Sequence, residues 1–144
     1  MNKEEILNLI RSNPVGYLAT TEGDQPRVRA LLMYKADENG IMFHTGTFKD
    51  LYEQIVKNPK VELCFNDFKS GVQVRVSGVL KEVESKDIKD EILNSPSRGF
   101  LREWVKDGSM SDFYKELAVF NLKDGKAITW TMKENFTDKK VIKL

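Results

Sequence analysis

Short apolar runs separated by turn sequences recur along this chain of 144 residues, and they constrain its fold more than any other feature. Alternation of apolar and polar residues over such lengths is typical of half-buried strands. The runs that predict strands are residues 15–21, 27–37, 41–45, 61–67, 72–84 and the two halves of 117–134. Lys123-Asp124-Gly125-Lys126 separates those two halves and predicts a hairpin turn. The sequence therefore indicates a protein built mainly of β-sheet.

Helical periodicity interrupts the strand pattern at three places. Residues 3–11 and 48–58 carry apolar side chains at helical spacing, and a proline follows the end of each segment. Residues 86–94 alternate charged with apolar side chains, which predicts a surface helix. A chain of this length fits one domain, residues 1–144. About six or seven mostly antiparallel strands with peripheral helices favour a β-barrel.

The charge balance and the scarcity of metal ligands argue against several classes of function. With 23 basic and 22 acidic residues the net charge is +1, so no bulk field attracts nucleic acid or an anionic membrane. The sequence contains neither a signal peptide nor an apolar run of about 18 residues. Cys64 and His44 are the only residues of their types, which argues against disulfides and Cys- or His-rich metal sites. We therefore expect a cytoplasmic protein that binds no metal, nucleic acid or membrane.

Basic and hydroxyl side chains gather around the third strand and the helix after it. Arg27 and Arg29 alternate on one strand and should share a face, although a twist or bulge could turn Arg27 toward solvent. The next strand ends with His44-Thr45-Gly46-Thr47 and leads into a helix that starts near Phe48 and Lys49. Helix N-termini and basic side chains both favour anions, so this segment is a candidate phosphate site. Taken alone, the same residues also fit a simple helix cap with a solvated lysine.

Two further signals are ambiguous when each is taken alone. Gln73 and Arg75 share one face of a strand whose other face is apolar, which also fits an ordinary solvent-facing side. Trp130 shares a face with Ile128, and this spacing favours a core or interface residue over a stacking platform.

Together, these features resemble a known family, the pyridoxamine 5′-phosphate oxidase-like, FMN-binding split barrels. The resemblance is carried by PRVRALLMYKADENGIMFHTGTFKDLYEQIVKNPKVELCF and VQVRVSG, between Pro26 and Gly78. Family members have an Arg followed by hydrophobic residues, an aromatic- or His-Thr pair, a basic residue at a helix start, Asn-Pro-x-Val, and a Gln opening a strand that ends in Gly. The counterparts here are Arg29 with Ala30 to Tyr34, His44-Thr45, Lys49, Asn58 to Val61, and Gln73 to Gly78.

The resemblance implies a split β-barrel that binds FMN in a groove between the two subunits of a homodimer. Arg29 and Lys49 would pair with the FMN phosphate, and Thr45 and Thr47 would donate hydroxyls to it. Gln73 would hydrogen-bond the flavin from the partner subunit. The cofactor-binding residues implied in this way are Arg29, Ala30, Leu31, Leu32, His44, Thr45, Thr47, Lys49 and Gln73.

Departures from the family pattern limit the activity that the resemblance implies. Phe48 stands where the oxidases carry an arginine, and Tyr34 stands where they carry a substrate-facing lysine, with Lys35 adjacent. The oxidases' C-terminal substrate motif with Arg and Trp is absent. The chain is thus similar to a short branch of the family, and we expect a flavin reductase-like or stress-related redox protein, not a pyridoxamine phosphate oxidase.

The leading hypothesis is an FMN-dependent oxidoreductase in which the reduced flavin passes electrons to a small substrate that the sequence does not identify. NAD(P)H is a candidate electron donor. No catalytic residue is assigned, and residues 86–116 are expected to govern substrate choice because they depart most from barrel strands. Three alternatives stay open: a non-enzymatic flavin-binding or sensing module, a haem or deazaflavin binder, and a structural barrel without ligand. His44 is the one histidine available to a haem iron.

Overall fold

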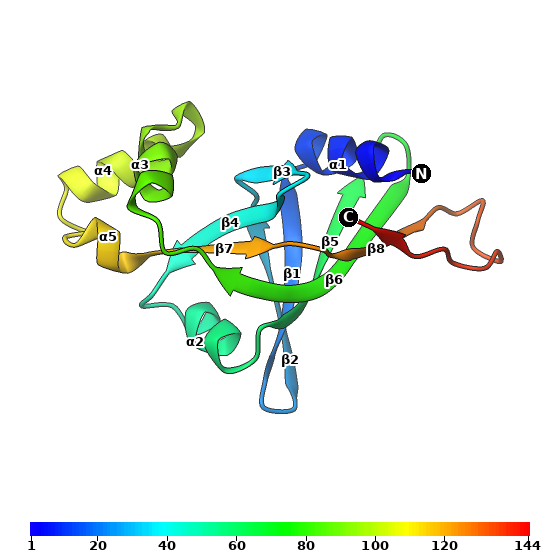
Figure 1. Cartoon of the computed structure of the whole chain (residues 1–144), viewed down its shortest axis with the longest axis horizontal. Helices are drawn as coiled ribbons and strands as arrows, with labels where there is room; N and C mark the ends of the chain where they lie inside the picture. Colours follow the sequence, from blue (N-terminus) through cyan, green and yellow to red (C-terminus); the bar gives the residue numbers. More distant parts are fainter.

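The computed structural model describes residues 1–144 and contains a strongly curved sheet with helices at its periphery (Figure 1). The strands are β1 (Val15–Glu22), β2 (Gln25–Leu32), β3 (Lys35–Asp37), β4 (Gly40–Gly46), β5 (Lys60–Asp67), β6 (Val72–Glu82), β7 (Leu117–Leu122), β8 (Lys126–Trp130) and β9 (Ile142–Lys143). The helices are α1 (Lys3–Ser12), α2 (Asp50–Lys57), α3 (Lys86–Asn94), α4 (Gly99–Lys106) and α5 (Phe113–Glu116), with a 3-10 turn η1 (Pro96–Arg98). No helix is both long and apolar enough to cross a bilayer.

The sheet forms a barrel that is split rather than closed. Neighbouring strands pair in the order β2-β1-β5-β6-β7-β4-β3, while β8 adds to β6 and β9 adds to β8. Every one of these pairings is antiparallel. No pairing joins β2 to β4, so the barrel is open along that line. The mainly β, split-barrel architecture expected from the sequence is confirmed.

The run 27–37, expected as one strand, is divided between the two halves of the barrel. Residues up to Leu32 pair with β1, whereas Lys35 to Asp37 pair with β4. Between them, the Met33 amide donates to Pro14 O and the Tyr34 amide donates to Met42 O. This division adds β3, and the two-residue β9 adds another strand, so the sheet has nine strands.

The hairpin expected within residues 117–134 is not formed, so that prediction was wrong. β7 pairs with residues 80–82 of β6, and β8 pairs with residues 73–77 of the same strand. The two strands therefore run in one direction along β6, end to end, and do not pair with each other (Figure 1). The turn sequence around Asp124, which has a φ of 57°, makes a local interruption instead of a reversal.

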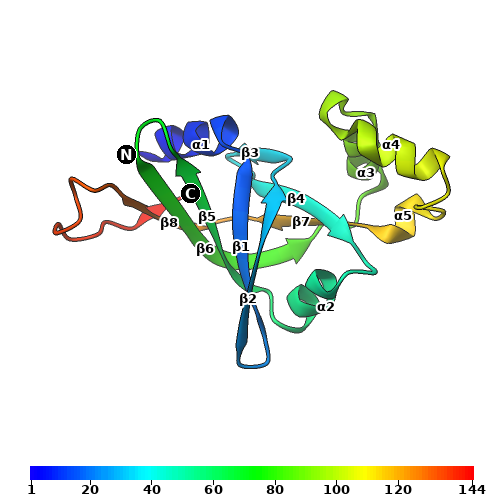
Figure 2. The same ribbon diagram turned by 180° about the vertical axis from the view of Figure 1, so that it is seen from behind.

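The interior of the barrel is one apolar core of 21 buried residues, to which α1 and α2 contribute Ile6, Ile10, Leu51 and Ile55 among others. A second core of 6 buried residues lies between the outer part of β7 and the helices α3, α4 and α5. These helices form an insertion at one end of the molecule, while the β8–β9 connection lies at the other end (Figure 2). The insertion is thus packed on its own apolar cluster beside the barrel opening.

Candidate functional site

A groove of about 870 Å³ follows the open side of the barrel, where β2 faces α2. We call it the β2–α2 groove. It is lined by Glu22, Arg27, Val28, Arg29, Ala30, Leu31, Thr45, Phe48, Lys49, Asp50, Leu51 and Gln54. Its volume is within the range usual for sites that hold cofactors and drug-sized ligands.

Arg29 is held rigidly at the inner wall of this groove. Its Nη1 donates to Leu18 O at 3.2 Å and to Thr20 Oγ1 at 2.7 Å, and its Nη2 donates to Gln54 Oε1 at 2.6 Å. An arginine has five N–H donors, and these bonds use three of them. The Nε hydrogen and one Nη2 hydrogen have no protein acceptor. Two parallel N–H donors on one guanidinium are the arrangement that binds phosphate or carboxylate in a bidentate manner.

The charge of Arg29 has no counterion within the chain. Its guanidinium is absent from every ion pair in the protein. Desolvation by burial, and then the nearby Arg27 cation, lower the pKa of Arg29 from its usual value. A partly buried cation without a carboxylate attracts an anion, because an anion would offset the cost of desolvation.

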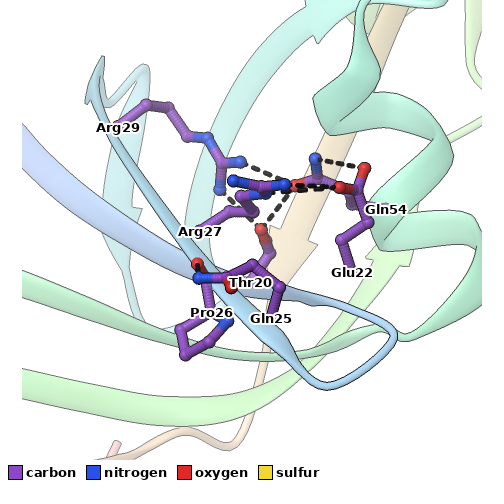
Figure 3. A network of polar contacts seen from close by, with 7 residues as sticks. All are labelled: Thr20, Glu22, Gln25, Pro26, Arg27, Arg29 and Gln54. Atoms are coloured by element: carbon purple, nitrogen blue, oxygen red, sulfur yellow. Dashed lines mark hydrogen bonds and ion pairs between the residues drawn. The ribbon is translucent and has the colours of Figure 1, made fainter.

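Arg27 lies on the same face of β2 as Arg29, but its charge is compensated (Figure 3). Its Nε and Nη2 both donate to Glu22 Oε1, at 3.3 and 2.9 Å. The other carboxylate oxygen of Glu22 accepts a bond of 3.4 Å from the side-chain amide of Gln54. Strand alternation therefore places both arginines toward the groove, and only Arg29 keeps an unneutralised charge.

The remaining candidates near α2 divide between groove and exterior. Thr45 is buried and lines the groove, as does the exposed Lys49, which makes no ion pair. Lys49 is the N-cap of α2 and makes no side-chain cap bond, so neither threonine caps this helix. Thr47 does not line the groove: its hydroxyl donates to Lys115 O at 3.4 Å, at the end of the insertion. Asp50 lines the groove at the first helical residue.

An apolar chamber of about 210 Å³ continues the groove beneath α4. We call it the α4 chamber. It shares Ala30, Leu31, Thr45, Phe48 and Lys49 with the groove, and it adds Leu32, His44, Gly46, Arg98, Phe100, Leu101, Trp104, Met110 and Leu117. Phe100 and Trp104 meet edge to face, with ring centroids 5.2 Å apart. The β2–α2 groove therefore forms the cationic end of the candidate site, and the α4 chamber forms its apolar end.

His44 lies in the wall of the α4 chamber and is bonded to the insertion. Its Nε2 accepts from the Nε of Arg98 at 2.8 Å. Burial, and then the Arg98 cation, lower the pKa of His44 to about 4, so the imidazole is neutral at pH 7. A haem iron could bind Nε2 only by displacing Arg98.

Gln73 lies outside the groove, on the outer face of the sheet. Its side-chain amide donates to Asn66 Oδ1 at 3.0 Å, and in the β6–β8 pairing it lies opposite Trp130. Gln73 lies opposite Asn66 of β5, and β1 lies between β5 and β2, so two strands separate β6 from β2. Arg29 faces the opposite side of the sheet. The chain therefore does not bring its own Gln73 to its own Arg29.

Sequence reasoning missed the three side chains that bond directly to Arg29 or His44: Gln54, Thr20 and Arg98. Gln54 follows Leu51 by three positions, so the helical period already places this polar residue on the buried face of α2. Thr20 likewise alternates with the buried Leu18 on β1. A polar residue at an apolar position was the available signal in both cases. Arg98 offered no such signal, because it lies in an irregular segment.

Comparison with known proteins agrees with this geometry. Residues 2–127 match the family described as pyridoxamine 5′-phosphate oxidase. Over 111 residues the chain is 28% identical to pyridoxine/pyridoxamine 5′-phosphate oxidase 2 of Hydrogenovibrio crunogenus, a match that covers 77% of this chain and 52% of that enzyme. The chain thus spans about half the length of the curated relatives that it matches.

Solved structures share the fold at low sequence identity. A NimC/NimA family protein from Clostridium acetobutylicum superposes with a TM-score of 0.75 at 24% identity, covering 99% of this chain and 93% of that one. A pyridoxamine 5′-phosphate oxidase-related, FMN-binding protein from Nostoc punctiforme superposes with a TM-score of 0.63 at 16% identity, covering 98% and 95%. With its split barrel and the match over residues 2–127, the chain belongs to the pyridoxamine 5′-phosphate oxidase family.

Proposed function

We propose that this protein binds FMN along the β2–α2 groove and the α4 chamber, and that it acts as an FMN-dependent oxidoreductase. The observation that carries the proposal is Arg29, a partly buried guanidinium with two unused N–H donors and no carboxylate partner. A phosphate monoester would supply both acceptors and the missing negative charge. Lys49 and the Thr45 hydroxyl would contribute from the opposite wall of the groove.

The apolar end of the site suits a flat ring system. Ala30, Leu31 and Leu32 would contribute backbone along the ring edge, and Phe100 and Trp104 would exclude water from above. The redox chemistry would be that of the bound flavin, while this chain binds, orients and dehydrates it. The Nostoc punctiforme relative, described as FMN binding, supports the choice of cofactor.

A homodimer is part of the proposal, because Gln73 could reach a flavin only in a second copy. The outer sheet face that carries Gln73 also exposes apolar side chains, among them Val15, Tyr17, Val28 and Leu32. A contiguous apolar face of this kind is typical of an interface between subunits. Pairing through this face would cover the exposed side of β2 next to Ala30 and Leu32.

The first test is retention of flavin. Purified protein is saturated with FMN and passed through gel filtration, and its absorbance and elution volume are recorded. We expect about one FMN per chain and the elution volume of a dimer, and flavin-free protein would overturn the proposal. Oxidation of NADH or NADPH with an added small acceptor then tests turnover. Negligible turnover by the FMN-loaded protein would favour the non-enzymatic flavin-binding module.

A further inference from the structure

We propose that Gln54, with Thr20, is a positioning residue that holds Arg29 in its anion-binding orientation without neutralising its charge. This inference rests on the proposed function, since it concerns how the same site selects a flavin that carries a phosphate. Neither residue belongs to the set that the sequence predicted.

Both residues are almost fully buried, Gln54 at 6% and Thr20 at 2% exposure. Oε1 of Gln54 accepts from the Thr20 hydroxyl at 2.7 Å and from Arg29 Nη2 at 2.6 Å. The Thr20 oxygen in turn accepts from Arg29 Nη1 at 2.7 Å. The three side chains therefore close a ring of hydrogen bonds (Figure 3). Rotation of the guanidinium would break bonds to buried partners, so the ring fixes which two N–H donors remain for a ligand.

The chemical type of residue 54 matters as much as its position. A carboxylate at the same place would form a buried ion pair with Arg29 and satisfy its charge within the protein. The amide accepts the same hydrogen bond and carries no charge. The carboxylate of this network, Glu22, is instead bonded to Arg27, and it orients the Gln54 amide by accepting from Nε2. The network thus neutralises Arg27 and leaves the Arg29 charge available to an anion.

The consequence is a preference for FMN over riboflavin that depends on Gln54. The two ligands share the ring and the ribityl chain and differ in the phosphate. A change that acts through Arg29 should weaken the binding of FMN and leave riboflavin nearly unaffected. A change that merely loosens the fold should weaken both to the same extent.

The experiment measures the dissociation constants of FMN and riboflavin for the wild-type protein and for Gln54→Glu. We expect the constant for FMN to rise at least about 10-fold, as for loss of a charge-assisted hydrogen bond, and the constant for riboflavin to change less than about threefold. Val56→Glu adds the same charge to an exposed position of α2 and is the matched control. It should change both constants less than about threefold, because exposed charges are screened.

A second pair of variants keeps the test independent of how Gln54→Glu folds. Thr20→Val removes the hydroxyl at nearly constant shape, and Thr20→Ser retains it. We expect Thr20→Val to lower the preference for FMN and Thr20→Ser to restore it. If the wild-type protein binds FMN but these variants leave the FMN-to-riboflavin ratio unchanged, the positioning role is overturned while the proposed function stands. If the wild-type protein binds no FMN, both are overturned.

Discussion

Arg98 donates its Nε hydrogen to Nε2 of His44 across 2.8 Å, and this bond joins the insertion to the wall of the α4 chamber. Arg98 is 2% exposed and also donates to the carbonyl oxygens of Leu32 and Met33, at 3.4 and 3.2 Å. One side chain therefore connects the helices of residues 86–116 to both β4 and the end of β2. This arginine therefore adds polar contacts to the apolar core that holds the insertion beside the site.

The His44–Arg98 bond predicts a specific acid sensitivity. An arginine nitrogen can only donate, so Nε2 of His44 must be unprotonated to accept. The pKa of His44 is about 4 in the folded protein against 6.5 as the reference, so the unfolded chain binds more protons between those values. Above about pH 6.5 the titration of His44 costs the folded protein nothing. As the pH drops toward 4, it lowers the free energy of unfolding by up to about 3 kcal/mol.

The measurement is the free energy of unfolding by denaturant at pH 7 and pH 4.5, for the wild-type protein and for His44→Gln. Glutamine can accept from Arg98 but does not titrate, so this variant should lose less stability on acidification. Carboxylates contribute equally to both proteins and cancel in the comparison. Equal losses in the two proteins would show that His44 does not titrate with a depressed pKa.

Arg29 and Lys49 are predicted to contribute unequally to FMN binding. Arg29→Ala removes a partly buried bidentate contact and should weaken binding about 10- to 150-fold, the equivalent of about 1.5–3 kcal/mol. Lys49 is exposed, so Lys49→Ala should weaken binding only about two- to fivefold. Fluorescence titration of FMN checks both values, with riboflavin as the control ligand. An Arg29→Ala protein with unchanged affinity would place the phosphate elsewhere.

The parts of the site that were predictable from sequence are those set by local periodicity. Strand alternation put Arg27 and Arg29 on one face, and the helical period located α2 next to Lys49. The division of the run 27–37 was not predictable, because it depends on Pro14 and Met42 accepting amides from distant segments. The path of β7 and β8 along β6 was missed for the same reason, since turn chemistry alone does not decide which strands pair.

The contact between His44 and Arg98 shows the limit of local reasoning most clearly. The two residues are 54 positions apart, and Arg98 lies in the 3-10 turn between α3 and α4. Buried arginines are rare, so the default expectation for a lone arginine in such a segment is solvent exposure. The acceptors that hold this side chain inward, His44 on β4 and the carbonyl oxygens of Leu32 and Met33, come from distant parts of the sequence.

Tyr17 is predicted to contribute to the proposed subunit interface. It is exposed to 44% on β1, in the row of the outer sheet face that also holds Ala30 and Cys64. Tyr17→Glu would place a charge in an apolar interface and should raise the dimer dissociation constant at least about 30-fold, as for loss of about 2 kcal/mol at a central aromatic residue. Sedimentation velocity over a range of concentrations measures this. Val56→Glu on α2 serves as the charge-matched control.

The same variant tests whether the partner completes the site. If Gln73 acts on the flavin of the other subunit, FMN affinity should fall together with dimerisation in Tyr17→Glu. A monomeric variant that retains full FMN affinity would contradict a contribution from the partner.

Gly78 is predicted to be required where β6 passes from its pairing with β8 to its pairing with β7. A Cβ atom at this position would lie 2.7 Å from Cδ1 of Leu122, which is 2% exposed. Gly78→Ala should therefore destabilise the protein by about 1–3 kcal/mol through overpacking, measured by denaturant unfolding. Gly99→Ala is the control, because Gly99 has helical angles and its nearest neighbour to such a Cβ is Arg102 Nη2 at 3.5 Å. This control should be neutral or slightly stabilising.

A double-mutant cycle between Gly78 and Leu122 identifies the cause of that loss. Leu122→Val removes the methyl group that the new Cβ would meet, at the cost of a small cavity. If the close approach of the two residues is what requires glycine, Leu122→Val should cost less in the Gly78→Ala background than alone, with a coupling of about 1 kcal/mol. If the two losses of stability are additive, removing the Leu122 methyl group does not restore stability to Gly78→Ala. Gly78 would then be needed for the backbone path of β6 and not for its contact with Leu122.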